Sequence, residues 1–230
     1  KPGSAAPLAA AAAPAAPAML PPRGTSRDNP ATATVLSRRR LNKPGSEKET
    51  WHIEFQLEDC LVYEVGDSFG LFPRNDPTLV DQVIAALGAP GDFPIADRTL
   101  REVLIDSVSL SPAPDMLFQL FSYITGGERR KKAKALANGE DPDGDAATLD
   151  VLAAIRKFEG VRPDPEAFIE SLDPLQPRLY SISSSPKVHK GRVSLTVDAV
   201  RYAIGKEKRS RLGVASTFLA NRVKPGDKIK

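Results

Sequence analysis

After residue 30, apolar and polar side chains alternate along the chain in the pattern of β-strands. In residues 51–57 the apolar Ile53, Phe55 and Leu57 fall on one face and polar side chains on the other, which is typical of a half-buried strand. The same pattern predicts strands over residues 31–36 and 68–72, a basic turn over 38–45 and a turn at 63–67. We therefore expect antiparallel β structure over residues 31–72.

The hydrophobic period changes from strand to helix after residue 75. Asp76 is a good N-cap, Pro77 suits the first helical turn, and Gly88 can end a helix that reaches Leu87. Further apolar stripes of helical period predict helices from Thr99 onward and over residues 115–123, 129–137, 148–158 and 165–172. The middle of the chain is therefore predicted to be mainly helical.

Strand patterns return after Pro177. Residues 178–183 and 192–202 are predicted strands, and the second is the longest in the chain. The remaining predicted elements are a basic loop over 204–211, a helix from Gly213 to about residue 223 and the start of a strand at 226–230. This order predicts an α+β fold, in which an antiparallel β-barrel or sheet is interrupted by inserted helices.

The first 22 residues contain ten alanines and six prolines and almost no charge. Because proline breaks an alanine helix and favours extended structure, they are predicted to form a semi-rigid, unfolded linker that follows a folded unit. A signal peptide is the alternative, but prolines interrupt the apolar run, and Lys1 alone would have to form the positively charged start of a signal peptide. The predicted organisation is a linker over 1–30, a first β part over 31–75, a helical connecting domain over 76–175 and a second β part over 176–230.

Charge is nearly balanced over the whole chain, with 32 basic and 29 acidic side chains, but it is unevenly distributed. Residues 1–50 carry 8 basic and 3 acidic residues, residues 51–176 carry 11 and 23, and residues 177–230 carry 13 and 3. The net charges are therefore +5, −12 and +10. We expect the basic C-terminal part to face an anionic ligand.

The rare residue types exclude several classes of protein. One cysteine, Cys60, excludes an internal disulfide framework and any cysteine-rich zinc or iron–sulfur site. No tight carboxylate cluster lies beside His52 or His189, so no metal site is predicted. No stretch approaches the roughly 20 apolar residues of a membrane-spanning helix. We expect a cytoplasmic protein without a membrane partner.

One candidate binding motif lies at the start of the second β part. In a strand, Arg178 and Tyr180 project from one face and Ser181 from the other. A guanidinium can bind phosphate, a phenol ring can stack on an aromatic cofactor, and a hydroxyl can bond ring nitrogens or carbonyls. The alternative is a polar strand that leads into a serine-rich turn.

A second candidate motif begins at Gly213. Glycine allows close approach of the backbone, Val214, Ala215 and Ser216 follow, and a helix begins. The unpaired N–H groups and the dipole at a helix N-terminus attract phosphate. The alternative is that Ser216 or Thr217 is only an N-cap.

Together the two motifs, with one long strand between them, resemble the FAD-binding module of the NADPH-dependent diflavin reductases, which are related to ferredoxin–NADP reductase. The family motif Arg-x-Tyr-Ser-x-x-Ser-Ser matches residues 178–185, and its Gly-x-x-Ser/Thr phosphate loop matches residues 213–216. Further matches are residues 41–50, 63–67 and 75–77. The resemblance covers about residues 30–230 and is closest in wording to the flavoprotein subunit of sulfite reductase.

This resemblance implies a barrel for FAD with a helical connecting domain inserted in the chain. It also implies a set of cofactor-binding residues on the two motifs and the strand between them. These are Arg178, Leu179, Tyr180, Ser181, Thr196, Val197, Asp198, Tyr202, Gly213, Val214, Ala215 and Ser216.

Individual roles follow from the same resemblance. Arg178 and the loop from Gly213 would bind the FAD pyrophosphate, and Tyr180 would pack on the flavin rings. Ser181, the candidate catalytic residue, would lie near the flavin N5 edge where hydride arrives. The strand over 196–198 would line the flavin through its backbone, and Tyr202 would lie further toward the nucleotide.

One residue departs from the family pattern. Asp198 stands where the family has a small or apolar residue. A carboxylate that faced the flavin would oppose negative charge on it, so we expect the Asp198 side chain to point away.

The resemblance also predicts what the rest of the enzyme would contain. A nicotinamide-binding domain would follow the barrel, and an FMN domain or flavodoxin-like partner would precede the linker. In the full-length protein, electrons would pass from NADPH through FAD and FMN to a haem or iron–sulfur acceptor such as sulfite reductase. The 230 residues alone are expected to bind FAD but not to turn over with NADPH.

Two alternatives from other classes remain at this point. In the first, the basic run over 206–211 contacts nucleic acid, but aromatic residues are sparse there and we expect no nucleic-acid partner. In the second, the chain keeps the fold as a non-catalytic docking module. The flavin content of the purified protein would distinguish this second alternative from an enzyme.

Overall fold

The computed structural model describes residues 23–26, 29–58, 61–204 and 209–230. The strands are β1 (Ala33–Arg40), β2 (Thr50–Leu57), β3 (Ser68–Leu71), β4 (Pro94–Ile95), β5 (Arg98–Thr99), β6 (Arg178–Ser181), β7 (Arg192–Asp198), β8 (Arg201–Ala203), β9 (Ser210–Leu212) and β10 (Lys228–Ile229). The α-helices are α1 (Pro77–Leu87), α2 (Leu100–Asp106), α3 (Asp115–Ile124), α4 (Gly127–Ala137), α5 (Val151–Lys157), α6 (Pro165–Glu170) and α7 (Val214–Thr217). A 3-10 turn (Ala146–Thr148) precedes α5, and a π-helical turn (Phe218–Arg222) continues α7.

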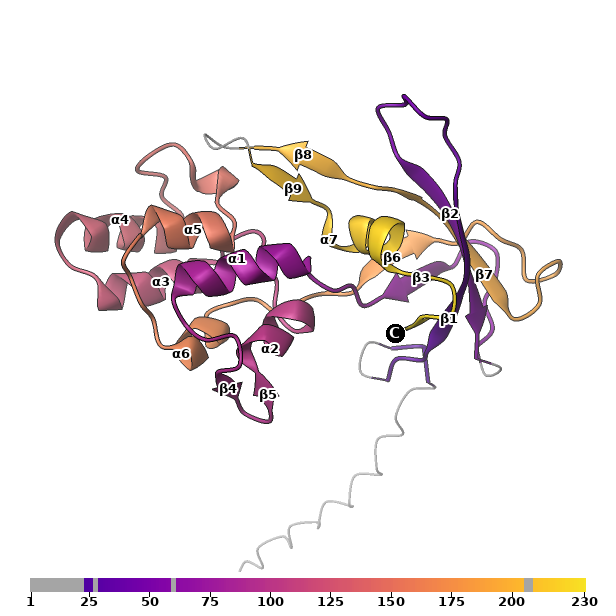
Figure 1. The fold of residues 1–230 in the computed structure, drawn as a ribbon, viewed down its shortest axis with the longest axis horizontal. Coiled ribbons are helices and arrows are strands. Elements are labelled where there is room, and N and C mark those ends of the chain that lie inside the picture. The colour runs from indigo at the N-terminus through magenta and orange to yellow at the C-terminus, as the bar shows by residue number, and fades with distance from the viewer. Residues whose placement is uncertain (1–22, 27–28, 59–60, 205–208) are drawn as a thin grey trace, which may run out of the picture.

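The strands of the main sheet are antiparallel and follow the order β10-β1-β2-β7, while β3 and β6 form a separate antiparallel pair. The pair joins the sheet on one side at the Ile182–Leu195 bridge. On the other side, the N–H of Phe72 donates to the carbonyl of Lys230 at 2.9 Å. The sheet curls around α7 to form a half-barrel, and the helices α1–α6 lie to one side of it (Figure 1).

The interior of this β part has its own apolar core. Ile53, Phe55 and Leu57 are buried, as the alternation predicts. The ring of Phe55 stacks on Phe69 of β3 with a centroid distance of 5.2 Å. Leu219, from the turn that continues α7, completes the core from the open side of the sheet.

A second apolar core lies among the helices. α1 has the predicted boundaries, because the Asp76 carboxylate accepts the N–H of Thr78 at 2.9 Å and Gly88 ends the helix with a positive φ of 72°. α2 begins with a capping box, in which Thr99 and Glu102 bond each other's backbone N–H groups. These local signals position the start of α1, where the chain leaves the β part.

Asn75 and Arg222 link the two cores at this junction. Asn75 is fully buried, and its Nδ2 donates to the carbonyls of Leu104 and Val108 at 2.7 Å. Arg222 donates from Nη1 to the carbonyl of Asn75 at 2.6 Å. Burial lowers the pKa of the Arg222 guanidinium, which is consistent with its place between the two parts.

The turn predicted over residues 38–45 starts too early, since β1 continues to Arg40. The Arg38 guanidinium lies 4.6 Å from the centre of the Trp51 ring and also donates to the carbonyl of Ala220. The strand therefore extends past its apolar residues because Arg38 packs on an aromatic ring and donates to the turn that continues α7.

The strand predicted to be the longest is broken after Asp198, and β8 begins at Arg201. The break occurs because Val200 bonds the loop that follows β9. Its N–H donates to Ser216 Oγ at 3.1 Å, and its carbonyl accepts the N–H of Gly213 at 2.9 Å.

The basic loop predicted over 204–211 is also shorter than expected. Its last residues form β9, which pairs with β8 as a two-stranded ribbon. Lys206 and Lys208, which the nucleic-acid alternative requires, lie outside the described residues.

Within the described ranges, no helix is long and apolar enough to cross a bilayer. Nor do any three His, Cys, Asp or Glu side chains in that part of the chain lie together as a metal site would require.

An acid-sensitive charge cluster lies on the helical part. Hydrogen bonds from Lys132 and Lys157 lower the pKa of Asp143 to about 2, from an ordinary value of 3.8. Asp143 therefore stabilises the fold above about pH 3.8, and this contribution is lost as the pH falls through its folded pKa. We expect D143N to be less stable than the wild type at pH 7, with the difference shrinking below pH 3.8 and vanishing only below about pH 2, as measured by urea unfolding across this range. A difference that does not change with pH would contradict this cause.

Candidate functional site

β6 and β7 form an opening in the β part. β6 pairs with β3 along its whole length, but among the described residues it meets β7 only at its C-terminal end. There Ile182 bridges Leu195, and the N–H of Ser183 donates to the carbonyl of Ser194 at 2.8 Å. In the direction of Arg178 no ladder joins the described residues of the two strands, and we call the space between their unpaired edges the fork.

Serine hydroxyls hold the closed end of the fork. Ser184 Oγ lies 2.7 Å from the Tyr63 hydroxyl and accepts the N–H of Ser194 at 3.0 Å. Ser183 Oγ donates to the carbonyl of Ser194 at 3.0 Å. Ser183 and Ser184 therefore fasten β6 to β7 at one end only.

The strand edges at the open end retain unused hydrogen-bonding groups. The next antiparallel pairs after the bridge would be Ser181 with Thr196 and Tyr180 with Val197, but no ladder joins these described residues. Backbone N–H and C=O groups of two strands therefore line the fork. A planar heteroaromatic ligand with donors and acceptors on its edge can satisfy such groups.

Arg178 and Tyr180 share one face of β6, as predicted. Their partners on β3 are Leu71 and Phe69, so both side chains start from the core side of the pair. Tyr180 is half-buried, and burial raises the pKa of its phenol while the nearby charge of Arg178 opposes that rise. Arg178 is exposed and donates to the carbonyl of Gln176 at 3.2 Å. The pair places a cation beside an aromatic ring at the mouth of the fork.

Leu179 and Ser181 lie on the opposite face of β6. Leu179 is 74% exposed and pairs with Gly70, and Ser181 pairs with Ser68. The predicted separation of Ser181 from Tyr180 is therefore confirmed by the register.

Val197 and Asp198 also occupy opposite faces of their strand. Val197 is buried, whereas Asp198 is exposed and lies 3.5 Å from the Thr50 hydroxyl of the neighbouring strand. Thr196 shares the exposed face and pairs with His52. The side chains of Thr196 and Asp198 thus point away from the core, and that of Val197 points into it.

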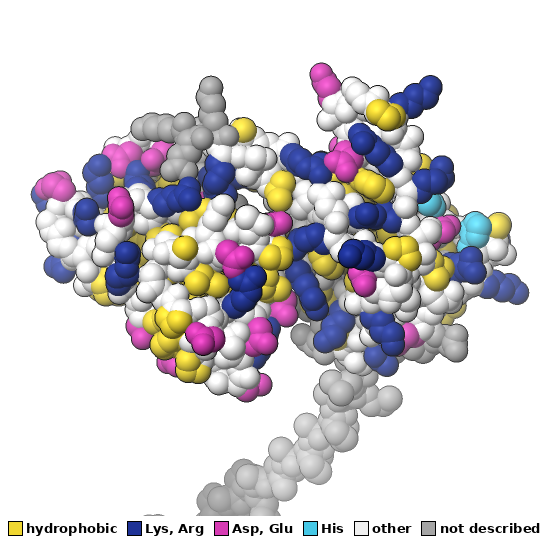
Figure 2. All heavy atoms as spheres, viewed as in Figure 1, with side chains coloured by type: hydrophobic (Ala, Val, Ile, Leu, Met, Phe, Trp, Pro, Cys, Tyr) yellow, Lys and Arg dark blue, Asp and Glu magenta, His cyan; other side chains and the backbone are white. Residues whose placement is uncertain are grey.

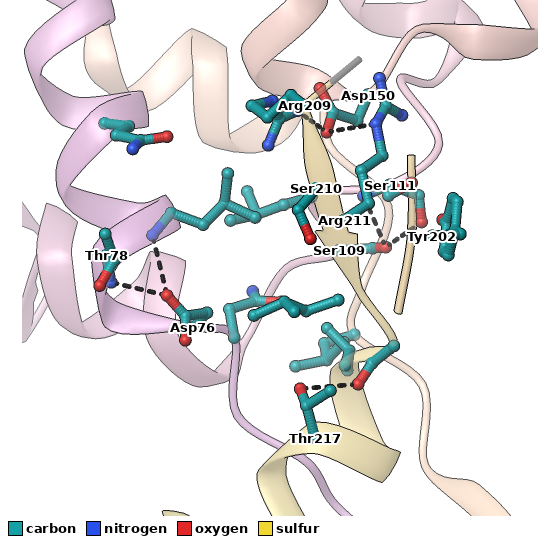
Figure 3. Close-up of a pocket in the computed structure, with 18 of the residues that line it drawn as sticks. Asp76, Thr78, Ser109, Ser111, Asp150, Tyr202, Arg209, Ser210, Arg211 and Thr217 are labelled. Carbon is teal, nitrogen blue, oxygen red and sulfur yellow. Dashed lines mark hydrogen bonds and ion pairs between the residues drawn. The ribbon is translucent and has the colours of Figure 1, made fainter. Parts of the chain in front are cut away.

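A cavity of about 400 Å³ extends from Arg178 to the start of the helices, and we call it the Arg178 cavity. Figure 3 shows its walls, which come from the N-terminal end of α1, the loops before α3 and α5, the ribbon and α7. Sequence motifs predicted four of its lining residues, which are Arg178, Tyr202, Gly213 and Val214. Among those not predicted as site residues are Asp76, Ser109, Ser111, Asp150, Arg209 and Arg211.

The loop at Gly213 is packed too tightly for a side chain. A Cβ on Gly213 would lie 2.6 Å from Ser216 Oγ and 2.9 Å from Val200 Cβ. The Thr217 hydroxyl donates to the carbonyl of Gly213 at 2.9 Å, and the first helical N–H bond is that of Thr217. The N–H groups of the three residues before it have no acceptor within the helix and can bind an anion.

The residues of this loop divide between the cavity and the interior. Gly213 and Val214 line the cavity, whereas Ala215 and Ser216 are buried. Because Ser216 Oγ already binds Val200, its hydroxyl holds the loop in place and only its backbone remains for a ligand.

The whole arrangement suits a dinucleotide. The fork offers an aromatic ring and two strand edges, and the adjoining cavity offers a guanidinium, the start of a helix and a second phenol. Tyr202 is 45% exposed at the cavity wall, so its ring can contact a ligand. On the face seen in Figure 2, Lys and Arg side chains are dense over the β part, whereas Asp and Glu side chains lie mostly over the helical part.

Comparison with known proteins finds a matching family and several relatives of similar sequence. The family model described as "FAD binding domain" matches residues 23–96 and 94–218. The chain is 36% identical over 232 residues to the sulfite reductase [NADPH] flavoprotein alpha-component of Bacillus subtilis, covering 96% of this chain and 37% of the relative. It is 34% identical over 224 residues to the NADPH–cytochrome P450 reductase of Dictyostelium discoideum, covering 87% and 33%. The chain thus spans about a third of the length of these relatives.

Proposed function

Because this chain belongs to the FAD binding domain family, we propose that it holds the FAD of an NADPH-dependent diflavin reductase. The observation that carries this proposal is the place of Arg178 between two features. It shares one face of β6 with Tyr180, beside the fork, and it lines the same cavity as the Gly213 loop. An aromatic ring, a guanidinium and the start of a helix thus follow one another, as the flavin and pyrophosphate of FAD would require.

In this proposal the flavin lies in the fork with one face on Tyr180. The backbone edges of residues 179–181 and 196–198 bind the polar rim of the ring, and Ser181 lies beside N5. Arg178 and the first N–H groups of α7 hold the pyrophosphate, since a guanidinium and a helix N-terminus both favour an anion. Tyr202 lies further along, toward the nucleotide. The exposed Asp198 carboxylate, on the outer sheet face, leaves the fork without a negative charge from this residue.

We also propose that the β part is a closed barrel, formed by residues 31–75 and 176–230. Supporting this, the ladders β10-β1-β2-β7 and β3-β6 are joined at the Ile182–Leu195 bridge and at the bond from Phe72 to Lys230. We assign residues 76–175 to an inserted connecting domain on the grounds of their separate core, and residues 1–30 to a linker.

When bound, FAD would accept a hydride and release electrons one at a time. We propose that the parent protein takes the hydride from NADPH and passes electrons through FMN to a haem or iron–sulfur acceptor. Relatives named as sulfite reductase and cytochrome P450 reductases support such an acceptor. The need for NADPH and the single cysteine fit a cytoplasmic location.

The nucleic-acid alternative is not favoured. It requires free basic side chains on the ribbon, but Arg209 forms an ion pair with Asp150, and Arg211 donates to the carbonyl of Thr148 at 2.5 Å. Basic residues held in this way are not available to a phosphate backbone.

Titration of the apoprotein with FAD tests the proposed function. We expect the 230-residue chain to bind one FAD per molecule with at least micromolar affinity and to quench flavin fluorescence as the ring stacks on Tyr180. Riboflavin, which lacks the pyrophosphate, should bind more weakly because it cannot contact Arg178. Failure to bind FAD at micromolar protein would contradict the proposal and would favour a docking module without flavin.

A further inference from the structure

The ribbon of β8 and β9 carries the Gly213 loop but has little core of its own. Its strands have three residues each, they pair only with each other among the described strands, and all of β8 is exposed. In Figure 1 the ribbon leaves the sheet and reaches over to the helical part. Because β9 ends at Leu212, the position of the ribbon determines that of Gly213.

A buried carboxylate on the helical part holds this ribbon. Asp150 is 2% exposed, forms an ion pair with Arg209, and has its Oδ2 3.6 Å from Arg211 Nε. It is also the N-cap of α5, where it accepts the N–H of Ala153 at 2.8 Å. One residue thus joins the start of a helix to Arg209, just before β9, and to Arg211 in the middle of β9.

The two arginines line the cavity, but both are held by partners on the helical part. The side chain of Arg211 is 10% exposed and that of Arg209 is 20% exposed. Figure 3 shows Arg209 and Arg211 on either side of Asp150 at one end of the cavity. Arg211 also donates to the carbonyl of Thr148, in the 3-10 turn before α5.

We propose that Asp150 is a positioning residue for the cofactor site. Through Arg209 and Arg211 it holds the ribbon against α5, and so holds the Gly213 loop where it can bind the pyrophosphate. This inference rests on the proposed function, because it assumes that the cavity receives FAD. It predicts that an ion pair remote from the flavin controls FAD affinity.

The substitution D150N tests this role. Asparagine keeps an oxygen that can accept the N–H of Ala153, so it retains the cap while removing the charge. We expect the dissociation constant for FAD to rise at least tenfold in a fluorescence titration. Without FAD, amide hydrogen exchange in β8 and β9 should become faster while exchange in β2 and β7 is unchanged. As a matched control, D81N removes an exposed Asp–Arg pair with Arg101 and should leave FAD affinity unchanged.

A double-mutant cycle shows whether Asp150 acts through the arginines. R211Q should weaken FAD binding, R211K should retain most of it, and D150N combined with R211Q should be little worse than either variant alone. If D150N does not fold, the variants R211Q and R211K still test the proposal.

Each other outcome has a defined meaning. Unchanged affinity in D150N overturns the positioning role. Tighter binding in D150N also overturns it, because Asp150 would then be restraining arginines that bind FAD directly. A wild-type chain that binds no FAD overturns the proposed function, and this inference with it. In contrast, if the wild type binds FAD and D150N binds it equally well, only the positioning role of Asp150 is overturned and the proposed function stands.

Discussion

Replacing Arg178 by alanine is expected to raise the dissociation constant for FAD by about 10- to 150-fold. A hydrogen bond to a charged group contributes roughly 1.5–3 kcal/mol, and each 1.4 kcal/mol is a factor of about ten in affinity. Arg178 is exposed at the cavity mouth and its charge reaches Tyr180, so its loss also removes positive potential beside the proposed flavin. The fold should be unaffected, because the side chain has no buried contacts to lose.

The measurement is a fluorescence titration of the apoprotein with FAD, accompanied by thermal unfolding. R178K should recover part of the affinity, since lysine keeps the charge but loses the planar donor fork. R192A is the matched control, because Arg192 is an exposed arginine on a neighbouring strand that does not line the cavity. Equal loss in R178A and R192A would mean that only the general positive field matters, and would contradict a pyrophosphate contact at Arg178.

Local sequence signals predicted those parts of the fold that depend on neighbouring residues. Asp76, Pro77 and Gly88 specify both ends of α1 within a few residues, and the structure has those ends. The alternation around Phe55 likewise specifies which face of β2 is buried. Such patterns work because caps and side-chain periodicity act over one or two turns of chain.

Features that depend on distant residues could not be predicted in the same way. Arg38 continues a strand because it meets Trp51 and a carbonyl at residue 220, which no local pattern indicates. The break at Val200 depends on hydrogen bonds to residues 213 and 216, further along the chain. In both cases the hydrogen-bonding partner is one that only the tertiary fold brings near.

The candidate site shows the same division. The motifs predicted Arg178, Tyr180 and the Gly213 loop because their chemistry is contained in short stretches of sequence. Asp150 was missed, since in the sequence it is one of many acidic residues in a segment of net charge −12. Its burial beside two arginines of the basic C-terminal part shows that opposite charges of the two segments meet at the cavity.

Gly213→Ala is expected to weaken FAD binding about as strongly as the loss of Arg178. The new Cβ would approach Ser216 Oγ to 2.6 Å and Val200 Cβ to 2.9 Å, and real Cβ atoms do not come so near to either. Overpacking of this kind costs about 1–3 kcal/mol, which corresponds to a melting temperature roughly 2–12 °C lower for a chain of this size. If the loop moves to relieve the contact, the N–H groups at the start of α7 move with it, and affinity should fall by about 10- to 100-fold.

Two further variants separate this steric cause from a general effect of removing glycine. Gly126, the N-cap of α4, has an extended backbone with a φ of −132° and open space around its Cα, so G126A should leave FAD affinity unchanged and cost only the small stability loss of an N-cap change. Adding S216A to G213A removes the nearer of the two obstructing atoms and should restore part of the affinity. The recovery should be incomplete, because Val200 still obstructs the Cβ and its N–H loses the Ser216 hydroxyl. If G213A binds FAD as tightly as the wild type does, FAD binding does not depend on the exact position of the Gly213 loop. The pyrophosphate would then be bound elsewhere in the cavity.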